Sequence, residues 1–191
     1  SRLVRIPPPY STWQEILPLK YGVDLYDPDI APDGSALVAS MMEINGRQRL
    51  VRIMIDSLMA GGVDYEVLHE FESTAPLNFV YSPDARYIYG STYLTGVSNL
   101  VRYDFSTRAV QWLTNVETGI FRPVPLGADS LIAFSYARQG FLPVLLTARP
   151  TEDVSAIRYL GADIADRHPV VQTWKLPPPS PGLINVDSLI V

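Results

Sequence analysis

The chain has 191 residues, 47% of them hydrophobic, which is enough to bury a sizeable core in one domain. Its net charge of −5 disfavours a protein that binds nucleic acid or an anionic membrane through a general positive surface. The absence of cysteine excludes disulfide bonds, thiolate metal sites and cysteine nucleophiles.

A short repeated motif is the strongest fold signal in the sequence. Leu-Val-Arg followed by Ile or Tyr begins at residues 3, 50 and 100, and a diverged copy occupies Val144–Thr147. The copies therefore start 44 to 50 residues apart, a period typical of repeated supersecondary units. The strand-like composition of each unit indicates the blades of a β-propeller.

The first predicted strands, Leu3–Ile6 and Thr12–Leu17, would form only the outer half of a blade. Pro7–Pro9 separates them at a place where no backbone donor is needed for a sheet. The chain is therefore expected to begin in the middle of a blade.

Each later unit begins with a tight turn and a short buried strand that ends in Ser. Ala31–Gly34 and Ser82–Ala85 are turn sequences, because Pro presets φ and Asp bonds to its own backbone. A second turn, which contains Gly46, Gly96 or Gly140, leads into the Leu-Val-Arg strand. The predicted fourth strands of the units are Val63–Leu68, Ala109–Leu113 and Ser155–Leu160.

These elements predict an all-β fold of propeller blades with four antiparallel strands each, about three complete blades plus partial terminal blades. The complete blades cover residues 26–68, 76–113 and 121–160, after a partial blade at 1–17. Residues 161–191 form a Pro-rich terminal segment that supplies closing strands or links to a further domain. Closing strands would complete a four-bladed ring, whereas a linker would make the chain a segment of a larger propeller, the interpretation we favour.

The first complete unit carries a series of matching positions: Pro28, Ala31–Gly34, Ser40, Gly46, Leu50 and Asp56. In this pattern the chain resembles the TolB-like (WD40-like) propeller repeat, and similar repeats occur in the propeller domains of prolyl-oligopeptidase-type enzymes. Ala31 and Ala85 depart from the motif, and the third complete unit lacks its Pro-Asp-Gly core. The resemblance implies a protein-binding propeller of the bacterial cell envelope, periplasmic or otherwise exported, and it implies no catalytic residues.

No motif for catalysis or cofactor binding occurs in the sequence. It contains no nucleophile elbow and no phosphate-binding glycine loop, and His69 and His168 do not form a zinc motif. Four aspartates between Asp24 and Asp33 are closely spaced, but prolines interrupt the residue order of a calcium loop. We therefore expect no catalytic residue, no metal and no cofactor.

Four residues are candidates for binding a partner: Tyr93, Phe121, Tyr136 and Arg138. They lie near turns between second and third strands or at blade entries, on the face that usually binds partners in propellers. Exposed aromatic side chains there are suitable anchors. Trp13 and Trp112, in contrast, hold similar places on fourth strands and are predicted to pack between blades.

The sequence thus favours a non-catalytic scaffold that binds a protein or peptide. An alternative is the gating propeller domain of a larger, prolyl-oligopeptidase-like hydrolase whose catalytic domain lies outside this chain. A third interpretation assigns catalysis to polar residues on the inner strands, namely Asp27, Asp29 and Asn78. No membrane insertion is expected, because no apolar run approaches the ~20 residues that span a bilayer. Exposed strand edges favour self-association.

Overall fold

The computed structural model describes residues 2–71, 74–127, 129–152, 167, 168 and 170. The chain divides into two compact units, residues 1–157 and 158–191. All of the described sheets belong to the first unit, and the predicted fourth strand Ser155–Leu160 and the Pro-rich segment 161–191 fall almost entirely outside the described residues.

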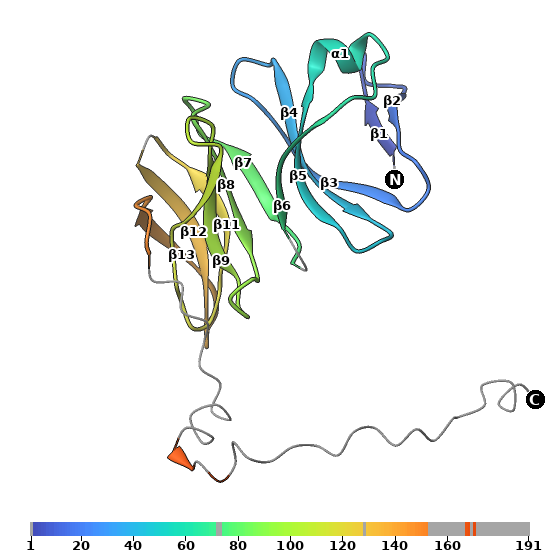
Figure 1. The fold of residues 1–191 in the computed structure, drawn as a ribbon. Coiled ribbons are helices and arrows are strands. Elements are labelled where there is room, and N and C mark those ends of the chain that lie inside the picture. Colours follow the sequence, from blue (N-terminus) through green and yellow to red (C-terminus); the bar gives the residue numbers. More distant parts are fainter. Residues whose placement is uncertain (1, 72–73, 128, 153–166, 169, 171–191) are drawn as a thin grey trace, which may run out of the picture. The chain divides into compact units, whose positions relative to one another are not determined.

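The first sheet has two strands. β1 (Arg2–Arg5) pairs antiparallel with β2 (Gln14–Pro18), so the first Leu-Val-Arg copy lies in a short hairpin (Figure 1). Trp13 just precedes β2 and is 58% exposed, so the prediction that it packs between blades is wrong.

The second sheet has four antiparallel strands in sequence order. These are β3 (Val23–Ile30), β4 (Ala36–Glu43), β5 (Gln48–Met54) and β6 (Glu66–Phe71). A short helix that the sequence did not predict, α1 (Ile55–Met59), follows β5 and buries Leu58. The turn after α1 ends with Gly62, whose N–H donates to the Ser57 carbonyl at 2.8 Å, so β6 begins three residues later than predicted.

The third sheet repeats this order with β7 (Leu77–Tyr81), β8 (Tyr87–Thr92), β9 (Asn99–Asp104) and β10 (Ala109–Trp112). Trp112 is half-buried against the core between the second and third sheets, as predicted. The fourth sheet consists of β11 (Ile120–Pro125), β12 (Ser130–Ala137) and β13 (Gly140–Thr147) among the described residues. The predicted fold class, all-β with antiparallel blades, is confirmed.

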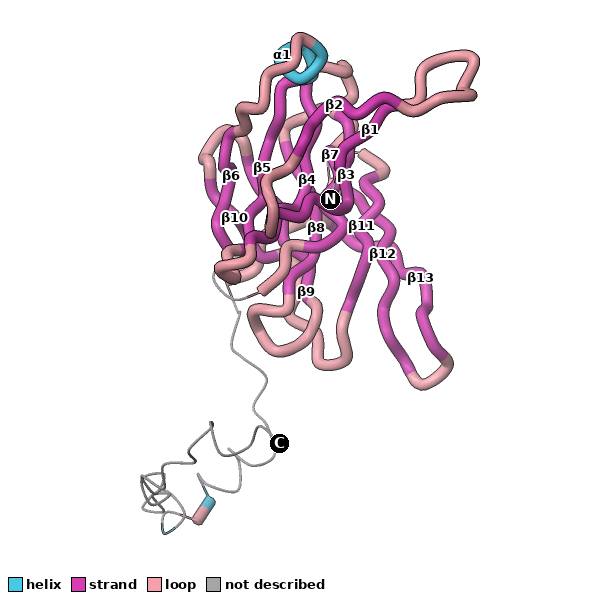
Figure 2. Tube along the Cα trace, turned by 90° about the vertical axis from the view of Figure 1, so that its right-hand side faces the viewer, coloured by secondary structure: helices cyan, strands magenta, loops and turns pink. Residues whose placement is uncertain are grey.

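The Leu-Val-Arg copies fall on β1, β5, β9 and β13, which lie in four different sheets. Most of the connecting loops lie at the two ends of the strands (Figure 2). The arginines of the three intact copies reach the neighbouring blade or its flanking helix: Arg5 donates to the Met59 sulfur at 3.6 Å, the Arg52 guanidinium lies 5.3 Å from the centre of the Phe105 ring, and Arg102 donates to the Ala148 carbonyl at 3.1 Å. The repeat therefore supplies both a strand and a contact between blades.

The inner strands β3, β7 and β11 each contain a β-bulge at the same place. At each bulge one residue has a positive φ: 51° at Asp27, 51° at Asn78 and 50° at Arg122. The Asp27 carboxylate accepts from the backbone N–H and the side-chain amide of Asn78, at 2.9 and 3.1 Å. The Asp29 carboxylate accepts from the backbone N–H of Tyr81 at 2.8 Å. These carboxylates therefore join neighbouring blades.

Candidate functional site

Three of the four predicted binding residues lie together. Tyr93 and Phe121 have ring centroids 6.2 Å apart, and Phe121 lies 5.4 Å from Phe141. Phe141 in turn lies 5.4 Å from Tyr136. The rings of Tyr93, Phe121, Phe141 and Tyr136 thus form one continuous series, here called the aromatic row.

The hairpin of β12 and β13 positions one end of the aromatic row. Tyr136 and Phe141 are direct cross-strand partners, separated by the two-residue turn Arg138–Gln139 and Gly140. Side chains of such partners face the same side of the sheet. The Tyr136 backbone is also fixed to the preceding loop, because its N–H donates to the Gly119 carbonyl at 3.0 Å and its carbonyl accepts from Thr118 at 2.8 Å.

A buried polar network holds the loops at the other end of the aromatic row. The Asn99 amide donates to the Thr95 hydroxyl at 2.9 Å, and its oxygen accepts from the Thr114 hydroxyl and the Val116 N–H, each at 2.9 Å. The buried Ser98 hydroxyl donates to the Ile120 carbonyl at 2.7 Å. Buried networks with satisfied partners restrict motion, so the loop that carries Tyr93 and the start of β11 that carries Phe121 have a defined geometry.

The aromatic row is accessible. Tyr93, Tyr136 and Phe141 are 43%, 50% and 59% exposed, and Phe121 is half-buried between them. Contiguous exposed apolar side chains of this kind are typical of interaction surfaces rather than of a random solvent-facing strand.

Arg138 lies at the tip of the same hairpin and is exposed, without a hydrogen bond or ion pair to any residue that the structure describes. Phe141 was not predicted. The register that makes it the partner of Tyr136 was the signal for it, since a two-residue turn before Gly140 places residues 136 and 141 opposite each other.

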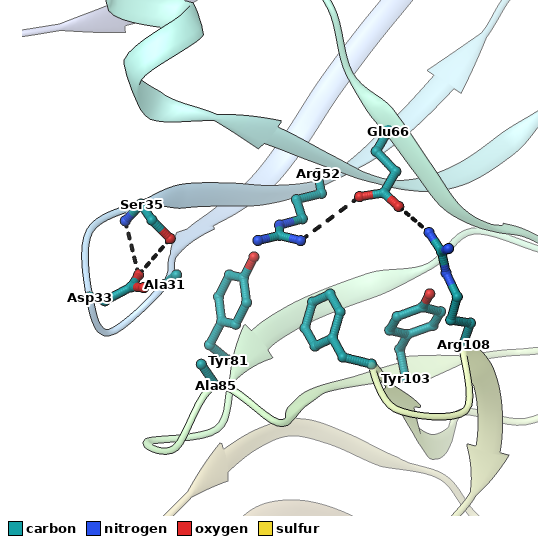
Figure 3. Close-up of a pocket in the computed structure, with 10 residues that line it drawn as sticks. Ala31, Asp33, Ser35, Arg52, Glu66, Tyr81, Ala85, Tyr103 and Arg108 are labelled. Carbon is teal, nitrogen blue, oxygen red and sulfur yellow. Dashed lines mark hydrogen bonds and ion pairs between the residues drawn. The ribbon is translucent and has the colours of Figure 1, made fainter.

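A second feature is a cavity of about 450 Å³ at the boundary between the second and third sheets, here called the interblade cavity. Figure 3 shows Arg52 and Glu66 from the second sheet facing Tyr81, Tyr103 and Arg108 from the third. The Arg52 guanidinium lies 5.3 Å from the centre of the Phe105 ring.

Charged groups at this cavity are linked across the blades. Arg108 Nη2 donates to Glu66 Oε1 at 2.5 Å, whereas Arg52 Nη1 is 3.9 Å from Glu66 Oε2. Burial raises the pKa of Tyr81 to about 12, against the opposing effect of the Arg52 charge, so its hydroxyl stays protonated at neutral pH.

The aspartates at and near the inner strands have hydrogen-bond partners within the fold. Asp27 and Asp29 bond to β7, as described above, and Asp33 accepts from the N–H and hydroxyl of Ser35 within its own turn. Within the described ranges, no group of three or more His, Cys, Asp or Glu residues could hold a metal ion. In that part of the chain there is also no helix both long and apolar enough to cross a membrane.

Neither a protein-family model nor a curated protein sequence matches the chain. Solved structures do share its fold. A TolB protein from Agrobacterium tumefaciens superposes with a TM-score of 0.58 at 19% identity, over 72% of this chain and 49% of that one. A puromycin-hydrolyzing peptidase from Mycobacterium tuberculosis gives 0.62 at 14% identity, over 78% and 27%. An oligogalacturonate lyase solved with manganese gives 0.56 at 15% identity, over 76% and 40%.

The chain spans less than half the length of each of these three structures. At such identities the likeness concerns the fold, which is that of TolB-like propeller blades, as the repeat motif predicted.

Proposed function

We propose that the chain is a non-catalytic β-propeller scaffold that binds a protein or peptide through the aromatic row. The observation that carries this proposal is the continuous series of four aromatic rings from two blades, joined by three ring contacts, with three of the four rings exposed. Large aromatic side chains dominate the affinity of protein interfaces because each removes much apolar area from water while losing little conformational freedom.

The hydrogen bonds that hold the segments of the aromatic row in place support the same proposal. A surface that is already ordered loses less entropy on binding than a flexible one. The Asn99 network and the bonds of Tyr136 to the Thr118–Gly119 loop order this surface before a partner arrives. Arg138, exposed beside Tyr136, adds a cation at the rim, where charges steer association more than they add affinity.

We place this scaffold in the bacterial cell envelope, in the periplasm or otherwise exported. The support is the fold shared with a TolB protein together with a cysteine-free, net negative chain. A net charge of −5 also makes nucleic acid an unsuitable partner.

The test is capture of partners by the purified chain and by a Tyr93→Ala/Phe141→Ala double variant, from an envelope fraction of the source organism. We expect a protein that the original chain retains and the double variant loses by tenfold or more, because truncating two central anchors typically costs about 2 kcal/mol or more. Binding of that protein, once purified, is then measured directly by calorimetry.

Tyr21→Ala is the matched control, since Tyr21 is a 96% exposed tyrosine in the turn before β3. It should retain the partner. Equal retention by the double variant, or equal loss by the Tyr21 variant, would show that the aromatic row is not the binding surface.

A second candidate function is the gating propeller domain of a larger hydrolase. The observation that favours it is the TM-score of 0.62 with the puromycin-hydrolyzing peptidase, of which this fold covers 27%. The discriminating observation is the full gene product: a Gly-x-Ser-x-Gly hydrolase domain encoded with this chain would decide for the gating function.

A further inference from the structure

Equivalent arginines of two repeats have different surroundings. Arg52 and Arg102 each occupy the third position of a Leu-Val-Arg copy. Arg102 is only 7% exposed; its Nε donates to Gln111 at 2.7 Å and its Nη1 to the Ala148 carbonyl at 3.1 Å. Arg52 has Glu66 as its cross-strand partner where Arg102 has Gln111, yet its Nε has no hydrogen-bond partner among the described residues and its Nη1 lies 3.9 Å from Glu66 Oε2.

The reason is that Glu66 is engaged elsewhere. Arg108 holds one Glu66 oxygen at 2.5 Å, which leaves Arg52 at 3.9 Å from the other. Two guanidinium groups therefore share a single carboxylate at the edge of the interblade cavity, as Figure 3 shows. Asp33 does not replace the missing acceptor: its Oδ1 accepts from the N–H and hydroxyl of Ser35, and no hydrogen bond or ion pair joins Asp33 to Arg52.

Two buried polar atoms at the cavity have no partner among the described residues: Nε of Arg52 and the hydroxyl of Tyr81. Tyr81 is 8% exposed, and its hydroxyl points toward the Arg52 guanidinium (Figure 3). Buried donors are rarely left without an acceptor, because losing hydration without a replacement is unfavourable. The Arg52 Nε–H can only donate and the Tyr81 hydroxyl can donate as well as accept, so a single group that satisfies both is an acceptor.

We propose that the interblade cavity is a binding site for a carboxylate group, which accepts hydrogen bonds from Arg52 and Tyr81. Beside Arg102, Gln111 and the Ala148 carbonyl supply the acceptors. Beside Arg52, in contrast, lies the interblade cavity of about 450 Å³. A carboxylate fits the planar guanidinium fork, and its single charge balances the second arginine of the Arg52–Glu66–Arg108 series.

The walls of the cavity restrict the ligand further. Tyr103 and Phe105 give it apolar surface, and their rings stand edge-to-face at 5.2 Å. The nearby Glu66 charge disfavours a doubly charged phosphate group more than a singly charged carboxylate. The carboxylate therefore comes from a small aromatic or aliphatic acid, or from the C terminus of a peptide.

The experiment uses the full chain labelled with ¹⁵N and follows the Nε–H signal of Arg52, assigned by its loss in an Arg52→Lys variant. Sodium benzoate and the peptide acetyl-Ala-Ala-Phe with a free C terminus are the probes. Benzamide and the C-terminally amidated peptide are their uncharged counterparts. We expect a saturable shift of the Arg52 signal with at least one acid and none with either amide.

Variants separate a binding role from a structural one. Tyr81→Phe should weaken binding roughly tenfold through loss of one charge-assisted hydrogen bond. Glu66→Gln should strengthen binding several-fold, because it removes the carboxylate that competes for the guanidinium groups. Arg47→Gln, which removes an exposed arginine paired with Glu70 at 3.5 Å, should leave binding unchanged.

Each result decides the proposal. Saturation by benzoate identifies small acids as ligands, and saturation by the free-acid peptide alone identifies a peptide C terminus. No saturable shift with either acid, an equal shift with the amides, or equal weakening by Arg47→Gln and Tyr81→Phe would overturn it. Because Tyr81→Phe and Glu66→Gln keep the side-chain volumes, their effects on binding report lost hydrogen bonds and charge rather than lost folding.

Discussion

Asp27 shows how one side chain can connect two blades. Its carboxylate satisfies the backbone N–H of Asn78 at the bulge of β7, a group that lacks a ladder partner on that side of the strand. Asp27 itself has a φ of 51°, a conformation that Asp and Asn tolerate better than other residues with a side chain. Asp27 therefore tolerates the positive φ and also accepts the hydrogen bond from Asn78. These two structural roles explain the residue better than a catalytic role does.

Replacing Asp27 with Ala should lower the free energy of unfolding by about 2–3 kcal/mol, because a part-buried N–H loses its acceptor and Ala is strained at positive φ. Asp27→Asn is the matched control. It keeps a side-chain oxygen and tolerates the same φ, so it should cost less than half as much. Urea denaturation followed by tryptophan fluorescence measures both, and equal losses would contradict this assignment.

At the residue scale, sequence reasoning found three members of the aromatic row because they flank turns of the repeat. It missed Phe141 because the facing of Tyr136 and Phe141 depends on the β12–β13 register. The interblade cavity could not be predicted, since it depends on whether Glu66 pairs more closely with Arg52 or with Arg108 of the neighbouring blade. The packing of the two sheets decides which pair forms, and no local sequence pattern indicates it.

At the scale of elements, facing side chains of β7 and β8 are complementary in size. Gly90 on β8 is buried, and a Cβ added there would lie 2.4 Å from the ring of Phe79. In the preceding repeat Pro28 stands at the position of Phe79 and Ala39 at that of Gly90. A larger residue on the inner strand is thus accommodated by a smaller one on the next strand, which preserves the thickness of the blade.

Gly90→Ala should therefore destabilise the fold by about 1–3 kcal/mol through overpacking against Phe79. Gly127→Ala serves as its control, because a Cβ there meets nothing within 4 Å and Gly127 does not have a positive φ. We expect that change to stay within about 0.5 kcal/mol. Thermal unfolding of the two variants compares them directly. A Gly90 variant as stable as the Gly127 variant would show that Phe79 does not pack on β8 in this way.

Element boundaries were predicted well wherever Pro, Asp and Gly mark a turn. The turns Ala31–Gly34 and Ser82–Ala85 do connect inner to second strands, and their Asp side chains accept from the residues that follow. The prediction was less accurate between β5 and β6, where α1 is inserted. The insertion interrupts the repeat without a capping side chain at Met54, so no start signal announced the helix.

At the scale of the whole molecule, the period of the Leu-Val-Arg motif predicted the architecture because the copies lie in different sheets, and β5, β9 and β13 are each the third strand of theirs. β5 and β9 lie in separate sheets, as the repeat requires. Self-association remains a prediction. Among the described strands, β13 pairs with a neighbour on one side only, and its Leu145 is 71% exposed. Self-association is therefore expected at the edge of β13.

The packing of two blades against each other brings Tyr93, Phe121 and Phe141 onto one surface, and the proposed binding surface depends on this packing. Nuclear Overhauser contacts between the ring protons of these residues, measured on the full chain in solution, test it directly. Centroid separations of 6.2 and 5.4 Å predict cross-peaks for Tyr93 with Phe121 and for Phe121 with Phe141. Assigned, resolved ring signals without those cross-peaks would contradict both the arrangement of the blades and the binding surface built on it.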